Sequence, residues 1–360
     1  LNLRGNSLKA LTAGAFLSTP YLTHLDLRNC QLERVEEGAF RGLGRLLHLN
    51  LASNSITVLY QEALDGLSSL QQLVLRQNNL EEMQLGAFSR LESLTLLDLR
   101  ENALVYLPDM VFQGLQSLKT LDLAHNQLRG LPALVGVGGL VRISLDGNPL
   151  LCSCLLLPFH RWMGRARVQA EGTCVAPPAL QGRPLDSLRP SEMKCGQPQA
   201  PGLNPTVPSV QTGGTTTGPC PTGCTCSPEF HHTNCENRGL RKIPRGFPTD
   251  TQLLDLRRNA LGMVPAGAFL GLKSLVSLHL QSCGITELRP GALRGLPNLV
   301  YLYLSDNHLS SLVPSAFEGV PRLAYLHLDH NAFTQVPSGA FQLLPNLFSL
   351  HLQHNAIREL

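Results

Sequence analysis

The stretch LQQLVLRQNNL, residues 70–80, contains the pattern from which the fold can be predicted. It has the form LxxLxLxxNxL, which recurs along the chain with a spacing of 24 residues, shortened once to 22. Its asparagine position is filled in a first series by Asn6, Cys30, Asn54, Asn78, Asn102, Asn126 and Asn148, and in a second by Asn259, Cys283, Asn307, Asn331 and Asn355. Two runs of one repeating unit are therefore expected.

The spacing of the leucines indicates how each unit folds. In a strand, alternate side chains point to opposite faces, so the LxL segment directs its leucines inward. One unit cannot bury them alone, whereas stacked units form a parallel sheet over a continuous core. This is the leucine-rich repeat signature, and it predicts an α/β solenoid of two tandem curved arrays with parallel concave sheets. Phenylalanines in the AF segments are expected to fill the convex side of the core: Phe16, Phe40, Phe88, Phe112, Phe269, Phe317 and Phe341.

Composition excludes several classes of protein. The net charge is +3 and charged residues make up 15% of the 360 residues, which gives no concentrated basic footprint for nucleic acid. No run of 18 apolar residues predicts membrane insertion. The motifs G-x-S-x-G, H-E-x-x-H and G-x-x-x-x-G-K-[ST] are missing from the sequence, so we expect neither an enzyme nor a cofactor.

Two cysteine clusters divide the chain. The ends of a solenoid expose leucines and strand edges, so each array needs caps. The first array (1–148) is followed by a predicted C-terminal cap (149–195) with Cys152, Cys154, Cys174 and Cys195. A linker rich in Pro, Gly and Thr (196–218) leads to a predicted N-terminal cap (219–250) with Cys220, Cys224, Cys226 and Cys235, and to the second array (251–360). Such clusters suit a secreted protein.

The two halves resemble one another. With an offset of 253 residues, AGAFL at 13–17 falls on AGAFL at 266–270, and Cys30 falls on Cys283. This indicates an internal duplication, and because the chain starts and stops inside a repeat, we expect it to be part of a longer precursor. Cys30 and Cys283 occupy asparagine positions, where a buried thiol with weaker hydrogen bonds is expected.

The cap spacing CX3CXCX8C, followed by ENRGLRKIP and 24-residue repeats, resembles the small leucine-rich proteoglycan family, in its chondroadherin branch. The resemblance implies secreted matrix proteins that bind collagen, influence fibril assembly and engage cells. It also implies the disulfides Cys220–Cys226 and Cys224–Cys235, although zinc held with His231 or His232 is the alternative for this cluster. In the other cap, Cys152–Cys174 with Cys154–Cys195 is favoured, and the nested pairing stays open.

The concave faces are the candidate binding surfaces. In the first array, acidic and arginine side chains run side by side, which suits either a solvated, self-neutralised face or a protein-binding one. Its candidates are Asp26, Arg28, Arg76, Asp98, Arg100 and Asp122. The second array carries tyrosine and histidine instead, and tyrosine is favoured at interfaces. Its candidates are His279, Tyr301, Tyr303, Tyr325, His327 and His351.

Two further hypotheses concern charged side chains. His327, His330, His351 and His354 fall on adjacent strands, and they are either a zinc site or solvated contact residues. Arg161, Arg165 and Arg167 in the first cap are either a glycosaminoglycan site or a solvated helix face. Two functions follow: a collagen-binding protein of the extracellular matrix, or a signalling ligand or cell-surface receptor ectodomain that binds another extracellular protein.

Overall fold

The computed structural model describes residues 1–154, 156–194, 220–228 and 231–358. It divides the chain into two compact units, Leu1–Gln199 and Ala200–Leu360, each of which is described by itself. The predicted linker and Cys195 lie outside the described residues. No helix within the described ranges has the length and apolar character needed to cross a bilayer.

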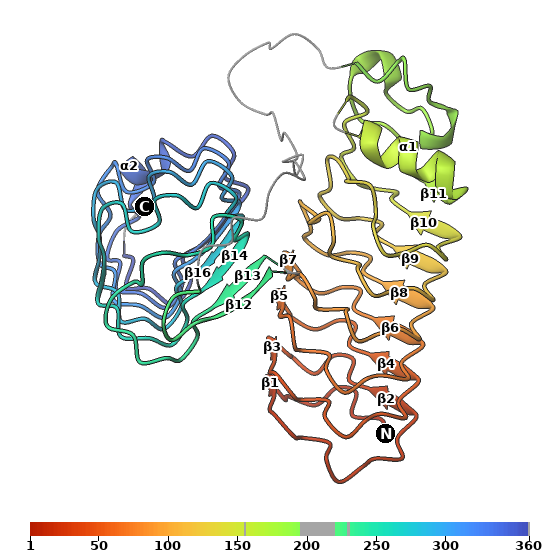
Figure 1. Ribbon diagram of the computed structural model, residues 1–360, viewed down its shortest axis with the longest axis horizontal. Coiled ribbons are helices and arrows are strands. Elements are labelled where there is room, and N and C mark those ends of the chain that lie inside the picture. The colour runs from red at the N-terminus through yellow and green to blue at the C-terminus, as the bar shows by residue number, and fades with distance from the viewer. Residues whose placement is uncertain (155, 195–219, 229–230, 359–360) are drawn as a thin grey trace. The chain divides into compact units, whose positions relative to one another are not determined.

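The first unit is built on a seven-stranded parallel sheet (Figure 1), which confirms the predicted solenoid. Its strand order is β11-β10-β9-β8-β6-β4-β2, so each repeat adds one strand beside the last. Short strands pair on another side of the coil, β1 with β3 and β5 with β7. The elements are β1 (Ala10–Leu11), β2 (His24–Asp26), β3 (Arg34–Val35), β4 (His48–Asn50), β5 (Val58–Leu59), β6 (Gln72–Val74), β7 (Glu82–Met83), β8 (Leu96–Asp98), β9 (Thr120–Asp122), β10 (Arg142–Ser144), α1 (Leu157–Ala166), β11 (Gln169–Glu171) and the 3-10 turns Pro178–Leu180 and Leu185–Ser187.

The second unit repeats this plan with a sheet of order β12-β13-β14-β16-β18-β19-β20. Only the β12–β13 pair, in the N-terminal cap, is antiparallel. The elements are β12 (Thr225–Ser227), β13 (His232–Asn234), β14 (Leu253–Asp255), β15 (Met263–Val264), β16 (Ser277–His279), β17 (Glu287–Leu288), β18 (Tyr301–Tyr303), β19 (Tyr325–His327), α2 (Ser338–Phe341) and β20 (Ser349–His351). Helices are few in both units, because turns rather than helices form most of the convex side.

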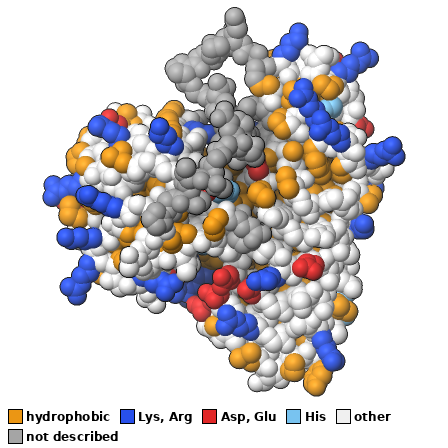
Figure 2. All heavy atoms as spheres, viewed as in Figure 1, with side chains coloured by type: hydrophobic (Ala, Val, Ile, Leu, Met, Phe, Trp, Pro, Cys, Tyr) orange, Lys and Arg blue, Asp and Glu red, His pale blue; other side chains and the backbone are white. Residues whose placement is uncertain are grey.

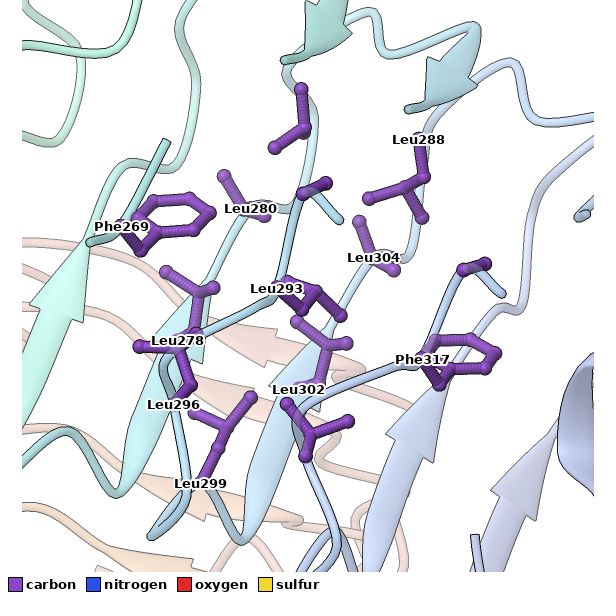
Figure 3. Packing of buried hydrophobic residues seen from close by; sticks show 14 of the residues in the cluster. Phe269, Leu278, Leu280, Leu288, Leu293, Leu296, Leu299, Leu302, Leu304 and Phe317 are labelled. Atoms are coloured by element: carbon purple, nitrogen blue, oxygen red, sulfur yellow. The ribbon is translucent and has the colours of Figure 1, made fainter. Parts of the chain in front are cut away.

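The leucines and phenylalanines form the core as predicted. Figure 3 shows Leu278 and Leu302 from neighbouring strands packed between the phenylalanine side chains of the convex side, Phe269 and Phe317. All four are at most 1% exposed. Burying a leucine side chain stabilises a fold by about 1.5–3 kcal/mol, so a column of leucines holds the coils together. Of the seven predicted phenylalanines, six are buried and Phe341 is half-buried.

A ladder of asparagines fixes the turn after each strand. The side-chain amide of Asn126, only 1% exposed, donates from Nδ2 to the carbonyls of Leu99 and Leu123, both at 3.0 Å. Its Oδ1 accepts the backbone N–H of Leu104 at 3.1 Å. From Asn54 onward, each asparagine of the ladder satisfies backbone groups in its own repeat and in the preceding one, as its position predicted.

The two cysteines of the ladder keep only part of this network. The Cys283 thiol donates to the Leu256 carbonyl at 3.0 Å, where asparagine would donate its amide. The cysteine side chain has no carbonyl to accept a hydrogen bond. The backbone oxygen of Cys283 accepts the N–H of Leu261 at 2.9 Å instead. Both cysteines are free and buried, and burial raises the pKa of the Cys283 thiol to about 11. The prediction of a buried thiol is confirmed at both positions.

In each unit a cap covers one end of the sheet. In the first, β11 pairs in parallel with β10, and α1 buries Phe159 and Met163. The disulfide Cys152–Cys174 is formed as predicted, Cys154 is itself disulfide-bonded, and its predicted partner Cys195 lies outside the described residues. In the second, Cys220–Cys226 and Cys224–Cys235 confirm the pairing that the resemblance implied.

Candidate functional site

The register of the sheets arranges the non-leucine side chains in columns. In the repeat strands before β20 the central leucine or isoleucine is buried, and the residues before and after it lie on the opposite, concave face. In β14, β16, β18 and β19 these flanking residues are buried as well. Because partners in register lie one repeat apart, their side chains stand about 4.8 Å apart on neighbouring strands. Each array therefore presents an ordered lattice of side chains.

The first array has an acidic column beside an arginine column, and at one end the two neutralise each other. The guanidinium of Arg28 donates to Asp26 from Nη2 to Oδ2 at 2.6 Å and from Nε to Oδ1 at 3.0 Å. These hydrogen bonds, with the charge of Arg28, lower the pKa of Asp26. His24 and His48 stack beside this pair with ring centroids 4.4 Å apart. Here the self-neutralised interpretation fits.

Farther along the sheet, the aspartates of the acidic column are not paired with arginines. Asp98 and Asp122 are register partners on β8 and β9. Arg100 turns to Glu101 instead, with Nε and Oε1 3.1 Å apart. Burial raises the pKa of Asp98, and the charge of Asp122 adds to this rise. Two carboxylates thus face the same side of adjacent strands without a guanidinium on either carboxylate among the described residues.

A hollow of about 400 Å³ opens over this charged end of the sheet. It is lined by Arg100, Thr120, Leu121, Asp122, Ala124, His125, Arg142, Ser144, Asp146 and Glu171. Sequence reasoning missed Asp146 and Glu171. Asp146 takes the place of an arginine in the shortened repeat, which was a usable signal. Glu171 lies on β11, a strand of the cap that the repeat pattern does not reveal.

The second array has columns of aromatic rings. Tyr301 and Tyr325 stack with centroids 5.1 Å apart in one column. In the other, His279, Tyr303, His327 and His351 follow one another at 4.4, 4.7 and 4.0 Å. The structure thus brings together all six residues predicted for this face. Five of them are buried, with exposed fractions of at most 7%, and His351 is half-buried.

The four histidines of the zinc hypothesis form two separate stacked pairs. The rings of His327 and His351 lie 4.0 Å apart, and those of His330 and His354 lie 4.3 Å apart. No three of these four histidines bring their ring nitrogens within 4.8 Å of one another. Asp329 lies between the pairs, with Oδ2 2.9 Å from His330 Nδ1. A three-ligand zinc site needs convergent nitrogens, which these four side chains alone do not supply.

The three cap arginines are exposed, with Arg161 in the middle of α1 and Arg165 and Arg167 at its C-terminal end. Arg161 and Arg165 are four residues apart on one helix face, and Arg167 follows at the left-handed C-cap, with φ 55°. Figure 2 shows basic side chains over this part of the first unit. The arrangement can offer three cations to an anionic chain, as the sequence suggested.

Comparisons with known proteins agree with this architecture. The model of the leucine rich repeat family matches residues 1–56, 20–80, 45–104, 92–150, 249–309 and 302–357. A chondroadherin-like protein of Mus musculus is 46% identical over 167 residues, 42% of this chain and 22% of that protein. Its counterpart in Homo sapiens is 45% identical over 171 residues, 43% of this chain and 22% of that protein. This confirms the predicted likeness to the chondroadherin branch.

The matched regions thus span about a fifth of the length of these relatives. Among solved structures, human 5T4 (Wnt-activated inhibitory factor 1, trophoblast glycoprotein) is 28% identical with a TM-score of 0.37, covering 54% of this chain and 87% of that one. The family matches run through residues 1–150 and 249–357, which is more than half of the chain. The chain therefore belongs to the leucine-rich repeat family.

Proposed function

We propose that this chain is a secreted, non-enzymatic protein of the extracellular matrix that binds collagen through its concave faces and so modulates fibril assembly and the contact of cells with the matrix. The disulfides of both caps support an oxidising, extracellular setting. Collagen as the partner class is what the resemblance of the cap spacing and repeats to the small leucine-rich proteoglycan family implies.

One observation carries the proposal: each concave sheet presents a regular lattice of polar or aromatic side chains. A collagen triple helix is a rod that exposes charged side chains at regular intervals. The unneutralised carboxylates Asp98 and Asp122, beside Arg100, can pair with basic and acidic side chains of such a rod. The tyrosine and histidine columns of the second array are buried, so a partner would have to uncover them before their stiff, amphipathic rings could make contacts.

Binding of the full chain to immobilised native fibrillar collagen, with heat-denatured collagen as the control, tests the proposal. Two double variants use residues that the same columns already contain. R76A/R100A places alanine where the column has Ala52 and Ala124, and Y301S/Y325S places serine where it has Ser277 and Ser349. The convex double variant R41A/R90A removes as many charges elsewhere.

We expect saturable binding that is lost on denaturation and that weakens about tenfold or more in at least one concave variant. The convex variant should bind like the wild type. Equal binding to denatured collagen, or concave variants that bind normally, would contradict the proposal. The chain would then be better explained as a ligand or receptor ectodomain for another extracellular protein.

A second contact is proposed at α1, where Arg161, Arg165 and Arg167 would bind a glycosaminoglycan. The triple variant R161Q/R165Q/R167Q should then elute from heparin at lower salt than the wild type. Unchanged elution would show that this helix face is only solvated.

A further inference from the structure

A second basic segment lies in the N-terminal cap of the second unit. In RGLRKIPR, residues 238–245, all four cationic side chains are exposed: Arg238, Arg241, Lys242 and Arg245. The segment therefore carries a charge of +4, while the whole chain carries only +3. Runs of this kind within eight residues are typical of polyanion-binding patches.

These cations are not neutralised by the protein. None of the four forms an ion pair with any residue that the structure describes. The nearest acid before the segment, Glu236, is bound by Arg257 at 3.0 Å and Arg258 at 3.6 Å. The nearest acid after it, Asp250, lies 3.1 Å from His231. Both flanking acids thus have partners outside the segment, which leaves its charge available.

The backbone of the segment is fixed before any partner arrives. Oδ1 of Asn259 accepts the N–H groups of Arg238 at 3.1 Å and Leu240 at 2.9 Å. The Leu240 carbonyl accepts the N–H of Ala260 at 2.8 Å, and the disulfide Cys224–Cys235 holds the residues just before the segment. A preformed loop loses less conformational entropy on binding than a flexible one.

The side chains of the segment are sorted to two sides. Leu240, Ile243 and Phe247 pack against the hydrophobic core of the second unit. The cationic residues lie between and beside them in the sequence and remain exposed. Eight residues extend over at most about 25 Å, so four positive charges stand along a short stretch of surface. This arrangement suits a linear chain with closely spaced negative charges.

We infer that residues 238–245 bind a sulfated glycosaminoglycan chain. Three of the four cations are arginines, whose planar guanidinium groups pair with oxyanions through two hydrogen bonds. The segment's aromatic neighbour Phe247 packs on the core and is not available for base stacking, as a single-stranded nucleic acid would require. The inference rests on the extracellular setting of the proposed function, and it is independent of collagen binding.

The test is titration of the full chain with a size-defined heparin oligosaccharide at several salt concentrations. In the variant R238Q/R241Q/K242Q/R245Q we expect affinity at physiological salt to fall about 30-fold or more. The slope of log affinity against log salt should flatten by about three, because a variant that forms fewer ionic contacts releases fewer counterions on binding. The charge-conserving variant R238K/R241K/R245K should keep most of the affinity. The convex variant R41A/R90A, which lies outside every proposed binding site, is the control for lost positive charge, and it should keep the wild-type affinity for heparin and the wild-type salt slope.

Several outcomes would overturn the inference. The quadruple variant could bind heparin like the wild type, or the wild type could bind no better than about threefold above hyaluronan, which lacks sulfate. Equal or tighter binding to phosphatidylserine vesicles would assign the segment to membranes instead. Unchanged unfolding temperature and unchanged binding to native collagen in the quadruple variant would show that a loss reflects the segment alone. A failure of collagen binding in all samples would refute the proposed collagen role without affecting the heparin result.

Discussion

The two arrays share one scaffold but differ in what they display on it. Both use buried leucines and an asparagine ladder, and both replace one asparagine by cysteine at equivalent positions, Cys30 and Cys283. On the concave side, however, the first array presents carboxylates and guanidiniums, whereas the second presents stacked tyrosine and histidine rings. The leucines and asparagines determine the backbone, and the residues between the leucines can change without altering it. One fold can therefore carry two binding chemistries.

The largest expected effect tests whether the scaffold is indeed equivalent in both arrays. Asn126→Ala in the first array and Asn307→Ala in the second should each reduce the free energy of unfolding by about 4 kcal/mol, because each leaves several buried backbone groups unsatisfied. Cys283→Ala should cost clearly less, because only its thiol donation is lost. Calorimetry of the full-length variants measures this, and a loss below about 1 kcal/mol for either asparagine would refute the equivalence.

The cap disulfides of the two units can be compared in the same way, and each is expected to contribute almost as much stability as a ladder asparagine. Removing Cys224–Cys235, with a sequence separation of 11, or Cys152–Cys174, with a separation of 22, should each destabilise its unit by about 3 kcal/mol. Double serine variants, followed by urea unfolding under non-reducing conditions, measure the two costs. A unit that unfolds at the same urea concentration without its disulfide does not depend on its cap for stability.

Ionisation of one half-buried aspartate should have opposite effects on stability in the two arrays, and these effects are smaller than those of the asparagines and disulfides. Burial raises the pKa of Asp98, so ionisation of this carboxyl group opposes folding. The stability contributed by its neutral form is fully present below the unfolded pKa near 3.8 and is lost as pH rises through the folded pKa. Burial alone would raise the pKa of Asp329, but hydrogen bonds from His327, His330 and Ser305 lower it. Its contribution is therefore present above the unfolded pKa near 3.8 and is lost as pH falls through the folded value.

Asp98→Asn should accordingly raise stability at pH 7 by at most about 1 kcal/mol, since Asp98 is partly exposed, and the gain should vanish near pH 3. Asp329→Asn should lower stability at pH 7 by about 1 kcal/mol. Thermal unfolding at the two pH values distinguishes the cases. If both substitutions change stability in the same direction at pH 7, the proposed difference in electrostatics between the faces is wrong.

The smallest effect concerns the neutralised end of the first array. Breaking the Asp26–Arg28 pair with R28A should change stability by less than about 0.5 kcal/mol, because both side chains are partly exposed to water. Asn50 already replaces aspartate, and Ala52 already replaces arginine, one repeat later. Urea unfolding with a repeat measurement in high salt checks this, and a loss above about 1.5 kcal/mol would mean that the pair is structural.

Much of this architecture follows from the sequence because the repeat is strict. The positions of Asn54 or Leu302 within the 24-residue unit are enough to place them in the turn or in the core. The sequence also placed Tyr301 beside Tyr325, since equal positions in neighbouring repeats become register partners. Where the pattern stops, prediction stopped as well: β11 and its Glu171 belong to a cap whose course the repeats do not dictate.

The sequence also did not predict which charged side chains form ion pairs. Asp26 and Asp98 occupy the same column, and both are followed two residues later by arginine, yet only Asp26 captures its arginine. The difference depends on neighbours such as Glu101 and Asp122, which compete through space. Likewise, adjacent strands brought the four histidines near one another, but ring stacking rather than spacing decided how their nitrogens are directed.

The most direct test of the concave-face account is amide hydrogen exchange of the full chain with and without native fibrillar collagen. The account predicts added protection in the segments that form the sheet faces, above all residues 96–101, 120–125 and 142–146 in the first array or 301–305 and 325–331 in the second. Protection confined to the convex turns or the caps, or no change in either array at saturating collagen, would contradict it.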